Sequence, residues 1–74
     1  MGNLFYTVIE NQGFANGTFA LLYNHYTDEN QAYSKYFTIC AAAALSEIPY
    51  HAAHLLRSDG NVSEYRVWDR RNEG

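Results

Sequence analysis

The alternation of apolar and polar residues predicts one helix that lies between two pairs of strands. Within residues 28–47 (DENQAYSKYFTICAAAALSE), apolar side chains recur at intervals of three and four, which is the spacing of a helix. Asp28 and Gln31 have the spacing of a capping box, which satisfies free N–H groups at a helix start. Pro49 disfavours the helical conformation for the residue before it, so the helix is expected to end near Ser46 or Glu47.

One apolar row of this helix is expected to face the rest of the protein. It consists of Tyr33, Phe37, Cys40 and Ala44, and Tyr36, Ala41 and Ala43 flank it. The C-terminal half of the helix carries consecutive alanines at positions 41–44. They have two explanations: alanine has the highest helix propensity, or its small side chain lets a sheet or a second helix approach closely. The packing explanation is preferred, with the aromatic rings filling the wider N-terminal end.

Extended segments precede and follow the helix, and turn residues separate the members of each pair. β-Branched and aromatic residues are frequent in the segments predicted as strands, which are Leu4–Glu10, Thr18–Tyr26, Tyr50–Arg57 and Val62–Asp69. Residues 11–17 (NQGFANG) and 58–61 (SDGN) contain the Asn-Gly and Asp-Gly pairs that are typical of turns. The third segment also has the alanine and leucine content of a helix, but the turn and the clear strand that follow it favour a strand.

The order of elements is therefore ββαββ, an α+β fold with a four-stranded antiparallel sheet and one helix packed on one face. Two strand orders fit, 2-1-3-4 and 1-2-4-3. The first is preferred because Leu4–Glu10 is apolar on both faces and should lie inside the sheet. A single helix of about five turns covers only one face of such a sheet. The other face must meet solvent or a second molecule.

Composition strengthens the case for a second molecule. The 74 residues are expected to form a single domain, 1–74, with seven Tyr, four Phe and one Trp, more rings than a core of this size encloses. The only cysteine, Cys40, excludes an internal disulfide and is interpreted as a small buried side chain. We expect self-association to supply the stability that the small core lacks. The expected assembly is a homodimer in which two sheets pack face to face or a helix packs on a sheet. The expected interface tyrosines are Tyr6, Tyr23, Tyr26 and Tyr65.

Charge and hydropathy narrow the range of partners. A net charge of −3 argues against nucleic acid, because proteins that bind it normally carry a basic face. The sequence has no leader pattern and no apolar run of about 18 residues, so we expect no membrane association. The predicted compartment is the cytoplasm.

Catalytic and cofactor chemistry is not expected. The chain has no Gly-x-Ser-x-Gly, no Gly-x-Gly-x-x-Gly and no phosphate-binding loop. Its carboxylates lie mostly at turns and segment ends, where they cap and solubilise rather than form an acid–base pair. The histidines, His25, His51 and His54, belong to no Cys/His cluster with metal-ligand spacing, so no metal site is predicted. The predicted protein is not an enzyme and needs no cofactor.

A cationic cluster near the C-terminus offers an alternative function. Arginines and a tryptophan share one face of the last predicted strand, and a further arginine lies across the preceding turn. Such groups stack on bases or pair with phosphates and carboxylates. The candidate site for a nucleotide or another anion is therefore Arg57, Arg66, Trp68 and Arg70. The preferred interpretation is a solvated strand whose arginines pair with Glu64 and Asp69.

Residues 31–61 (QAYSKYFTICAAAALSEIPYHAAHLLRSDGN) resemble small phage and prophage accessory proteins of uncharacterised function. The shared features are an aromatic-then-alanine helix, a strand and an Asp-Gly turn. The resemblance implies a small accessory protein, often an oligomer, that binds a host component, and some such proteins inhibit bacterial defence systems. It includes no functional motif and assigns no site residue. The predicted function is thus a homo-oligomeric interaction protein that binds a partner protein, in the host cytoplasm if it is phage-encoded.

Overall fold

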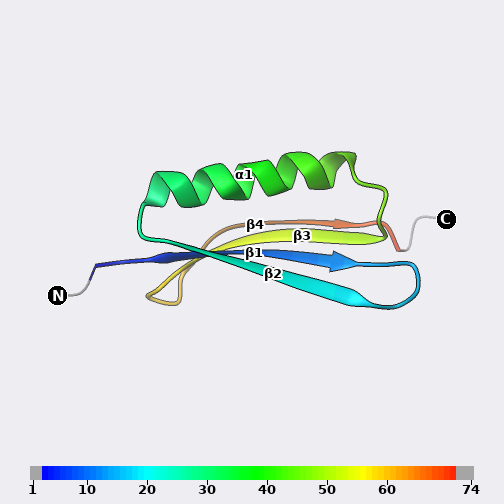
Figure 1. Ribbon diagram of the computed structural model, residues 1–74, viewed down its shortest axis with the longest axis horizontal. Helices are drawn as coiled ribbons and strands as arrows, with labels where there is room; N and C mark the ends of the chain where they lie inside the picture. Colours follow the sequence, from blue (N-terminus) through cyan, green and yellow to red (C-terminus); the bar gives the residue numbers. More distant parts are fainter. Residues whose placement is uncertain (1–2, 72–74) are drawn as a thin grey trace.

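The structure is a computed structural model that describes residues 3–71, and its elements follow the predicted order. These elements are β1 (Tyr6–Gly13), β2 (Phe19–Tyr26), α1 (Glu29–Leu45), β3 (Tyr50–Arg57) and β4 (Val62–Asp69). The strands form one antiparallel sheet in the order β2-β1-β3-β4, with the helix on one side (Figure 1). The predicted α+β fold and the preferred strand order 2-1-3-4 are confirmed.

The first strand begins later and continues further than the sequence indicates. It runs to Gly13, past the predicted end at Glu10, and each of its residues lies opposite one residue of β2 and one of β3. Pairing along both edges satisfies the backbone N–H and C=O groups of this segment, which outweighs the turn preference of Asn11 and Gly13. The first turn is consequently shorter than predicted and is confined to residues 14–18.

Two glycines close the hairpins where the sequence predicts turns. Gly17 has φ +86° and Gly60 has φ +91°, in the left-handed region that glycine adopts without steric cost. Next to each glycine, a short polar side chain holds the turn. Asn16 Oδ1 accepts a hydrogen bond from the Thr18 N–H at 3.1 Å. Asp59 Oδ1 accepts one from the N–H of residue 61, also at 3.1 Å.

The helix begins and ends close to the predicted residues. Asp28 is the N-cap, and its Oδ1 accepts a hydrogen bond from the Asn30 N–H at 3.2 Å. At the other end the Ser46 N–H donates to the Ala43 carbonyl at 3.2 Å, and the Ser46 hydroxyl oxygen accepts from the Ile48 N–H at 3.2 Å. These bonds satisfy backbone groups that the end of a helix leaves without partners.

The row that the helix buries is not the predicted one. The buried side chains are Ala32, Tyr36, Ile39 and Ala43. Of the predicted row, Tyr33 and Cys40 are half-buried against the core, whereas Phe37 and Ala44 are exposed. The prediction was wrong by one position, which rotates the face by about 100°. Phe37, which is 59% exposed, packs its ring against Tyr33 and Tyr36 rather than against the sheet.

The consecutive alanines do not form one contact surface. Only Ala43 is buried, and Ala41, Ala42 and Ala44 are exposed. Close approach of the helix to the sheet therefore explains one of these alanines. The other three contribute through the high helix propensity of alanine, which was the less favoured explanation.

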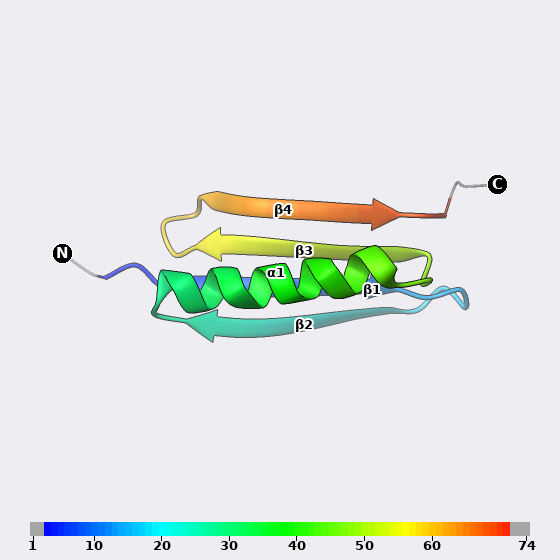
Figure 2. The ribbon, with the colours of Figure 1, turned by 90° about the horizontal axis from the view of Figure 1, so that it is seen from above.

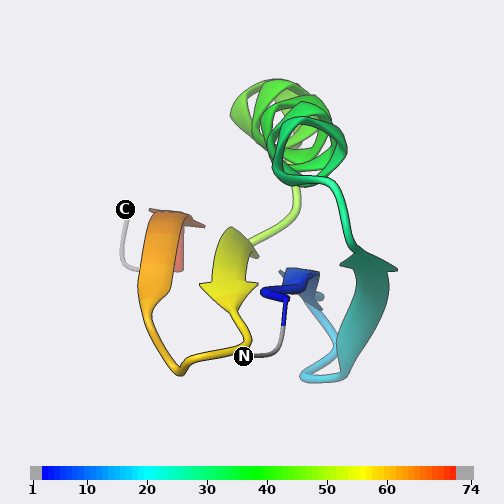
Figure 3. The ribbon, with the colours of Figure 1, turned by 90° about the vertical axis from the view of Figure 1, so that its left-hand side faces the viewer.

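The protein has two layers, a helix and a sheet. The helix runs along the sheet above its middle strands β1 and β3 (Figure 2), and no helix or strand of residues 3–71 covers the opposite side (Figure 3). Side chains between the layers form the core, which consists of Tyr6, Val8, Ala32, Tyr36, Ile39, Ala53 and Leu55. Burial in this core, with Cys40 nearby, raises the pKa of the Tyr36 phenol above its ordinary value.

Candidate functional site: the open face of the sheet

The side of the sheet that faces away from α1 is here called the open face. Side chains alternate between the two sides of a strand, and directly paired residues share a side, so the strand pairing assigns every residue to a face. The open face consists of Thr7, Ile9, Asn11, Gly13, Phe19, Leu21, Tyr23, His25, Tyr50, Ala52, His54, Leu56, Val62, Tyr65, Val67 and Asp69.

Large apolar side chains on the two outer strands of the open face are exposed. In β2 the exposed fractions are 62% for Phe19, 52% for Leu21 and 57% for Tyr23. In β4 the residues are Val62, Tyr65 and Val67, at 50%, 65% and 45%. Between these strands the side chains of β1 and β3 are half-buried or buried by their neighbours. The open face is therefore mostly apolar, with Thr7, Asn11, His25 and His54 among its rings and aliphatic side chains, and no helix or strand of residues 3–71 covers it.

Charged side chains of the strands lie almost entirely on the other side. Each of four charged residues is paired with a core residue and therefore faces the helix side: Glu10, Arg57, Glu64 and Arg66. Only Asp69 faces the open side, at the end of β4, where it pairs with Arg71 at 2.7 Å. An antiparallel sheet with one solvated face usually places its polar residues on that face. The distribution in this sheet is the reverse.

The predicted interface tyrosines are divided between the two sides of the sheet. Tyr23 and Tyr65 lie on the open face, and the ring of Tyr65 stacks on His54 with a centroid distance of 6.2 Å. Tyr6 is 7% exposed within the core, and Tyr26 is half-buried against the core on the helix side. In this fold Tyr6 is therefore a packing residue and Tyr26 is partly one, and only Tyr23 and Tyr65 of the four predicted tyrosines lie on the open face.

The predicted arginine and tryptophan site is not assembled. Arg66 lies over the Trp68 ring, 5.3 Å from its centroid, on the helix side of the edge strand β4. Arg57 instead binds Asp59 in the adjacent turn through two hydrogen bonds of 2.6 and 3.2 Å, an exposed pair that lowers the Asp59 pKa. Arg70 is engaged elsewhere, at the C-terminal end of the helix.

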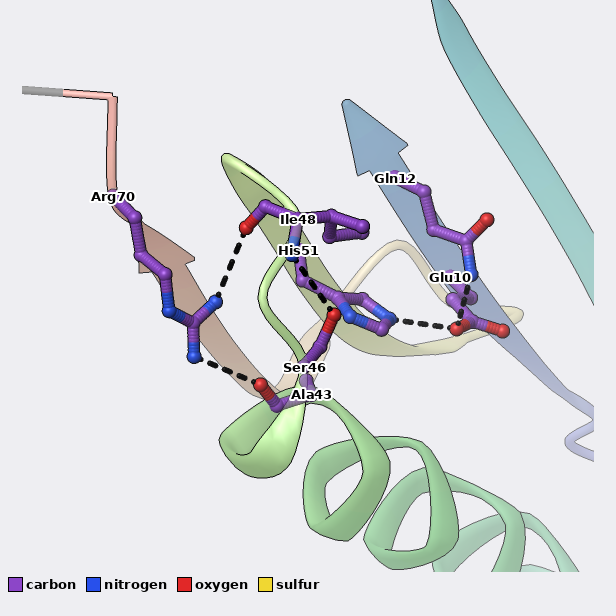
Figure 4. Close-up of polar contacts among 7 residues, drawn as sticks. All are labelled: Glu10, Gln12, Ala43, Ser46, Ile48, His51 and Arg70. Carbon is purple, nitrogen blue, oxygen red and sulfur yellow. Dashed lines mark hydrogen bonds and ion pairs between the residues drawn. The ribbon is translucent and has the colours of Figure 1, made fainter. Parts of the chain in front are cut away.

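Arg70 joins the end of β4 to the end of α1 (Figure 4). Its guanidinium donates to the Ala43 carbonyl at 3.0 Å and, more weakly, to the Ile48 carbonyl at 3.5 Å. A cation at this position satisfies orphan carbonyls and complements the negative end of the helix dipole. The next arginine, Arg71, pairs with Asp69 and lies 4.9 Å from the centroid of the Tyr50 ring. The Arg71 guanidinium lowers the Asp69 pKa to about 2.

A buried polar group that the sequence did not predict lies beneath the C-terminal half of the helix. His51 is 4% exposed, and its Nε2 lies 2.7 Å from Glu10 Oε2, which also accepts a hydrogen bond from Gln12 Nε2 at 2.9 Å (Figure 4). His51 Nδ1 is buried without a hydrogen-bond partner in the described chain. Strand alternation alone does not predict this contact. It depends on the register of β1 and β3, in which Gln12 lies directly opposite His51.

Residues 3–71 contain no group of three or more His, Cys, Asp or Glu side chains that could hold a metal ion. A shallow cleft of about 580 Å³ lies at the end of the sheet, between the first turn and the entrance to β3. Phe14, Phe19 and Pro49 supply apolar walls, and Arg70 and Arg71 lie on its polar side. Both arginines already bind partners within the chain, so the cleft has no strong anchor for a ligand.

Comparisons with models of known protein families, with curated proteins and with solved structures find no match to this chain. Within the described part of the chain, no helix combines the length and the apolar character needed to cross a bilayer.

Proposed function

We propose that the protein is a non-enzymatic interaction protein that places the open face of its sheet against an apolar surface of a partner protein. The placement of charge carries this proposal. Four of the five Asp, Glu and Arg residues of the strands lie on the helix side, and most side chains of the exposed side are rings and aliphatic groups. An exposed apolar layer of this kind is typical of a surface that another molecule covers.

The exposed rings supply enough apolar area to matter. Phe19, Tyr23 and Tyr65 are 57–65% exposed, and an aromatic side chain carries roughly 150–250 Å², so the three expose about 350 Å². At about 25 cal/mol per Å², covering them contributes about 9 kcal/mol before the costs of association. Those costs are roughly 4–15 kcal/mol. Stable binding therefore requires the neighbouring aliphatic side chains as well as the rings.

The partner surface that fits this face is apolar and uncharged. A lysine or carboxylate placed against the open face would lose its water without gaining a counter-ion. The resemblance of residues 31–61 to small phage and prophage accessory proteins supports a host protein as the partner. Inhibition of a bacterial defence system, in the host cytoplasm, is the activity that this resemblance suggests.

The test introduces one charge on the open face and one on the helix. Proteins retained by the immobilised wild type are identified from a host lysate, purified, and titrated against three chains: wild type, Val67→Asp and Leu45→Asp. Val67 lies on the open face, and Leu45 is 86% exposed at the end of α1. An unpaired charge buried in an interface costs about 3 kcal/mol or more, so Val67→Asp should weaken binding by at least about 100-fold.

The control variant Leu45→Asp should bind with unchanged affinity, and both variants should keep the far-ultraviolet circular dichroism of the wild type. Equal affinity of the Val67→Asp variant and the wild type would exclude the open face as the contact surface. A wild-type chain that retains no protein reproducibly would also contradict the proposal.

A second candidate function is the binding of a nucleotide or another anion, and only the cleft beside Arg70 and Arg71 favours it. Its volume of about 580 Å³ is suitable for a small ligand. The engagement of both arginines within the chain weighs against it. A thermal-shift screen with inorganic phosphate and nucleoside mono-, di- and triphosphates is decisive. A rise in Tm that Phe14→Ala abolishes would favour this function, and the absence of any rise would exclude it.

A further inference from the structure

The two edge strands of the sheet differ in how they are protected against pairing with another strand. The exposed edge of a sheet presents unpaired N–H and C=O groups, and proteins commonly block it with charges, prolines or bulges. β4 has such protection: it carries Glu64, Arg66 and Asp69, and its register shifts opposite Leu55 and Leu56. β2 (FALLYNHY) has no Lys, Arg, Asp, Glu or Pro, and its pairing with β1 is regular over eight residues.

At the centre of β2, side chains are also exposed on both sides of the sheet. Leu21 and Tyr23 face the open side and are 52% and 57% exposed. Leu22 faces the helix side but is still 48% exposed, because α1 lies over β1 and β3 (Figure 3). An apolar strand at an unprotected edge, with exposed side chains above and below it, lacks a neighbour on that edge.

We propose that the missing neighbour is β2 of a second copy, so that two chains form one eight-stranded antiparallel sheet about a two-fold axis. In a two-fold contact residue i meets residue j while j meets i, and only residues at the axis meet their own copies, so a charge at the centre of the strand would face a like charge. β2 has no such charge. Backbone pairing would supply the hydrogen bonds, and the side chains of Leu21, Leu22 and Tyr23 would supply the apolar contact.

The register of this contact follows from the alternation of the backbone. The Phe14 N–H donates to the Thr18 carbonyl at 2.9 Å, so alternate residues from Thr18 onward, including Leu22, direct their backbone groups to β1. Leu21 and Tyr23 then direct theirs to the free edge. Placing Leu22 opposite its own copy pairs Leu21 with Tyr23 on each side of the axis, and apolar residues then meet throughout the centre of the contact.

Pairing at β2 also enlarges the open face. Four strands of eight residues span about 26 by 19 Å, or about 500 Å² in projection. A standard protein–protein interface takes about 800 Å² of accessible surface from each partner, so a larger open face gives a partner more surface to cover. Two copies joined at β2 present about 1,000 Å² in one continuous face. The advantage of a larger open face rests on the proposed function, whereas the pairing of β2 with its copy does not.

The test is a cross-link across the two-fold axis. In a Cys40→Ala background, Leu22→Cys would place two thiols at a non-hydrogen-bonded pair, whose Cα atoms lie about 4.5 Å apart and within the range of a disulfide. Mild oxidation at micromolar concentration should convert most of this variant to a disulfide-linked dimer on a non-reducing gel. Leu45→Cys in the same background is the control and should remain mostly monomeric, because Leu45 is exposed at the end of α1, which packs chiefly on β1 and β3 rather than on β2.

Light scattering supplies an independent measurement that needs no cysteine. The wild type should have twice the chain mass of 8.5 kDa. Leu22→Lys sets two like charges against each other and should weaken dimerisation by at least about tenfold, whereas Leu45→Lys should not. A monomeric wild type, or equal cross-linking of Leu22→Cys and Leu45→Cys, would overturn the proposal. Failure of Val67→Asp to weaken partner binding would overturn only the proposed function, because Val67 lies on β4, far from this edge.

Discussion

The packing between helix and sheet can be tested with two neighbouring alanines that differ only in exposure. Ala43 is completely buried, while Ala42 is exposed on the same helix. Replacing either by leucine adds the same three carbon atoms and changes the helix propensity very little. Any difference between the two variants therefore measures the space between α1 and the sheet.

The expected difference follows from the tight packing of protein interiors. Ala43 is on the face of α1 that contacts the sheet, so Ala43→Leu must displace the helix or force side chains from their preferred rotamers. Overpacking of this kind costs about 1–3 kcal/mol. For a domain of this size, each 1 kcal/mol lowers Tm by roughly 4–8 °C. Ala42→Leu should change the free energy of unfolding by no more than about 0.5 kcal/mol.

The measurement is urea-induced unfolding at 25 °C, followed by circular dichroism at 222 nm. All variants are compared at one protein concentration, because self-association would make the apparent stability depend on concentration. Equal unfolding midpoints for Ala43→Leu and Ala42→Leu would refute the reasoning. In that case helix propensity alone would explain the whole run of alanines.

Two further predictions concern the arginines at the end of β4. Arg70→Met keeps the aliphatic stem but removes the hydrogen bonds to the end of α1. It should lower the free energy of unfolding by about 1–2 kcal/mol in the same urea assay. An unchanged unfolding midpoint would show that this contact contributes nothing to stability. The Asp69 pKa is held at about 2, below its ordinary value of 3.8, chiefly by hydrogen bonds from the Arg71 side chain. Because the folded-state pKa is the lower one, the pair stabilises the fold above about pH 4, and this contribution is lost as the pH falls towards 2. Arg71→Gln should return the Asp69 pKa towards 3.8 in an NMR titration of its carboxyl carbon, and a value that stays near 2 would contradict this origin.

The architecture could be predicted because the sequence specifies it with local signals. Asn16-Gly17 and Asp59-Gly60 fix the hairpins, and Asp28 fixes the start of the helix. The strand order required one further inference, from the two apolar faces of the first strand. Each of these signals lies within a few residues of the structure that it determines.

The details that could not be predicted depend on contacts between distant residues. Apolar side chains occupy two neighbouring rows of the helix, and only packing on the sheet selects the row with Ile39 over the row with Phe37. The contact between His51 and Glu10 spans 41 positions and depends on the register of two strands. The arginines were grouped by strand alternation, which gave no sign that Arg70 would turn to the end of the helix.

The two-layer architecture has a consequence for how long the protein persists in a cell. Small domains have a narrow margin of stability, and here the exposed apolar side chains of β2 and β4 on the open face gain their full stabilisation only when something covers them. Anything that binds the folded chain but not the unfolded one adds its binding free energy to the fold. If the open face is where a partner binds, unoccupied copies would unfold more often and be degraded sooner than occupied ones. The amount of this protein in the cell would then follow the amount of its target, without a separate regulator.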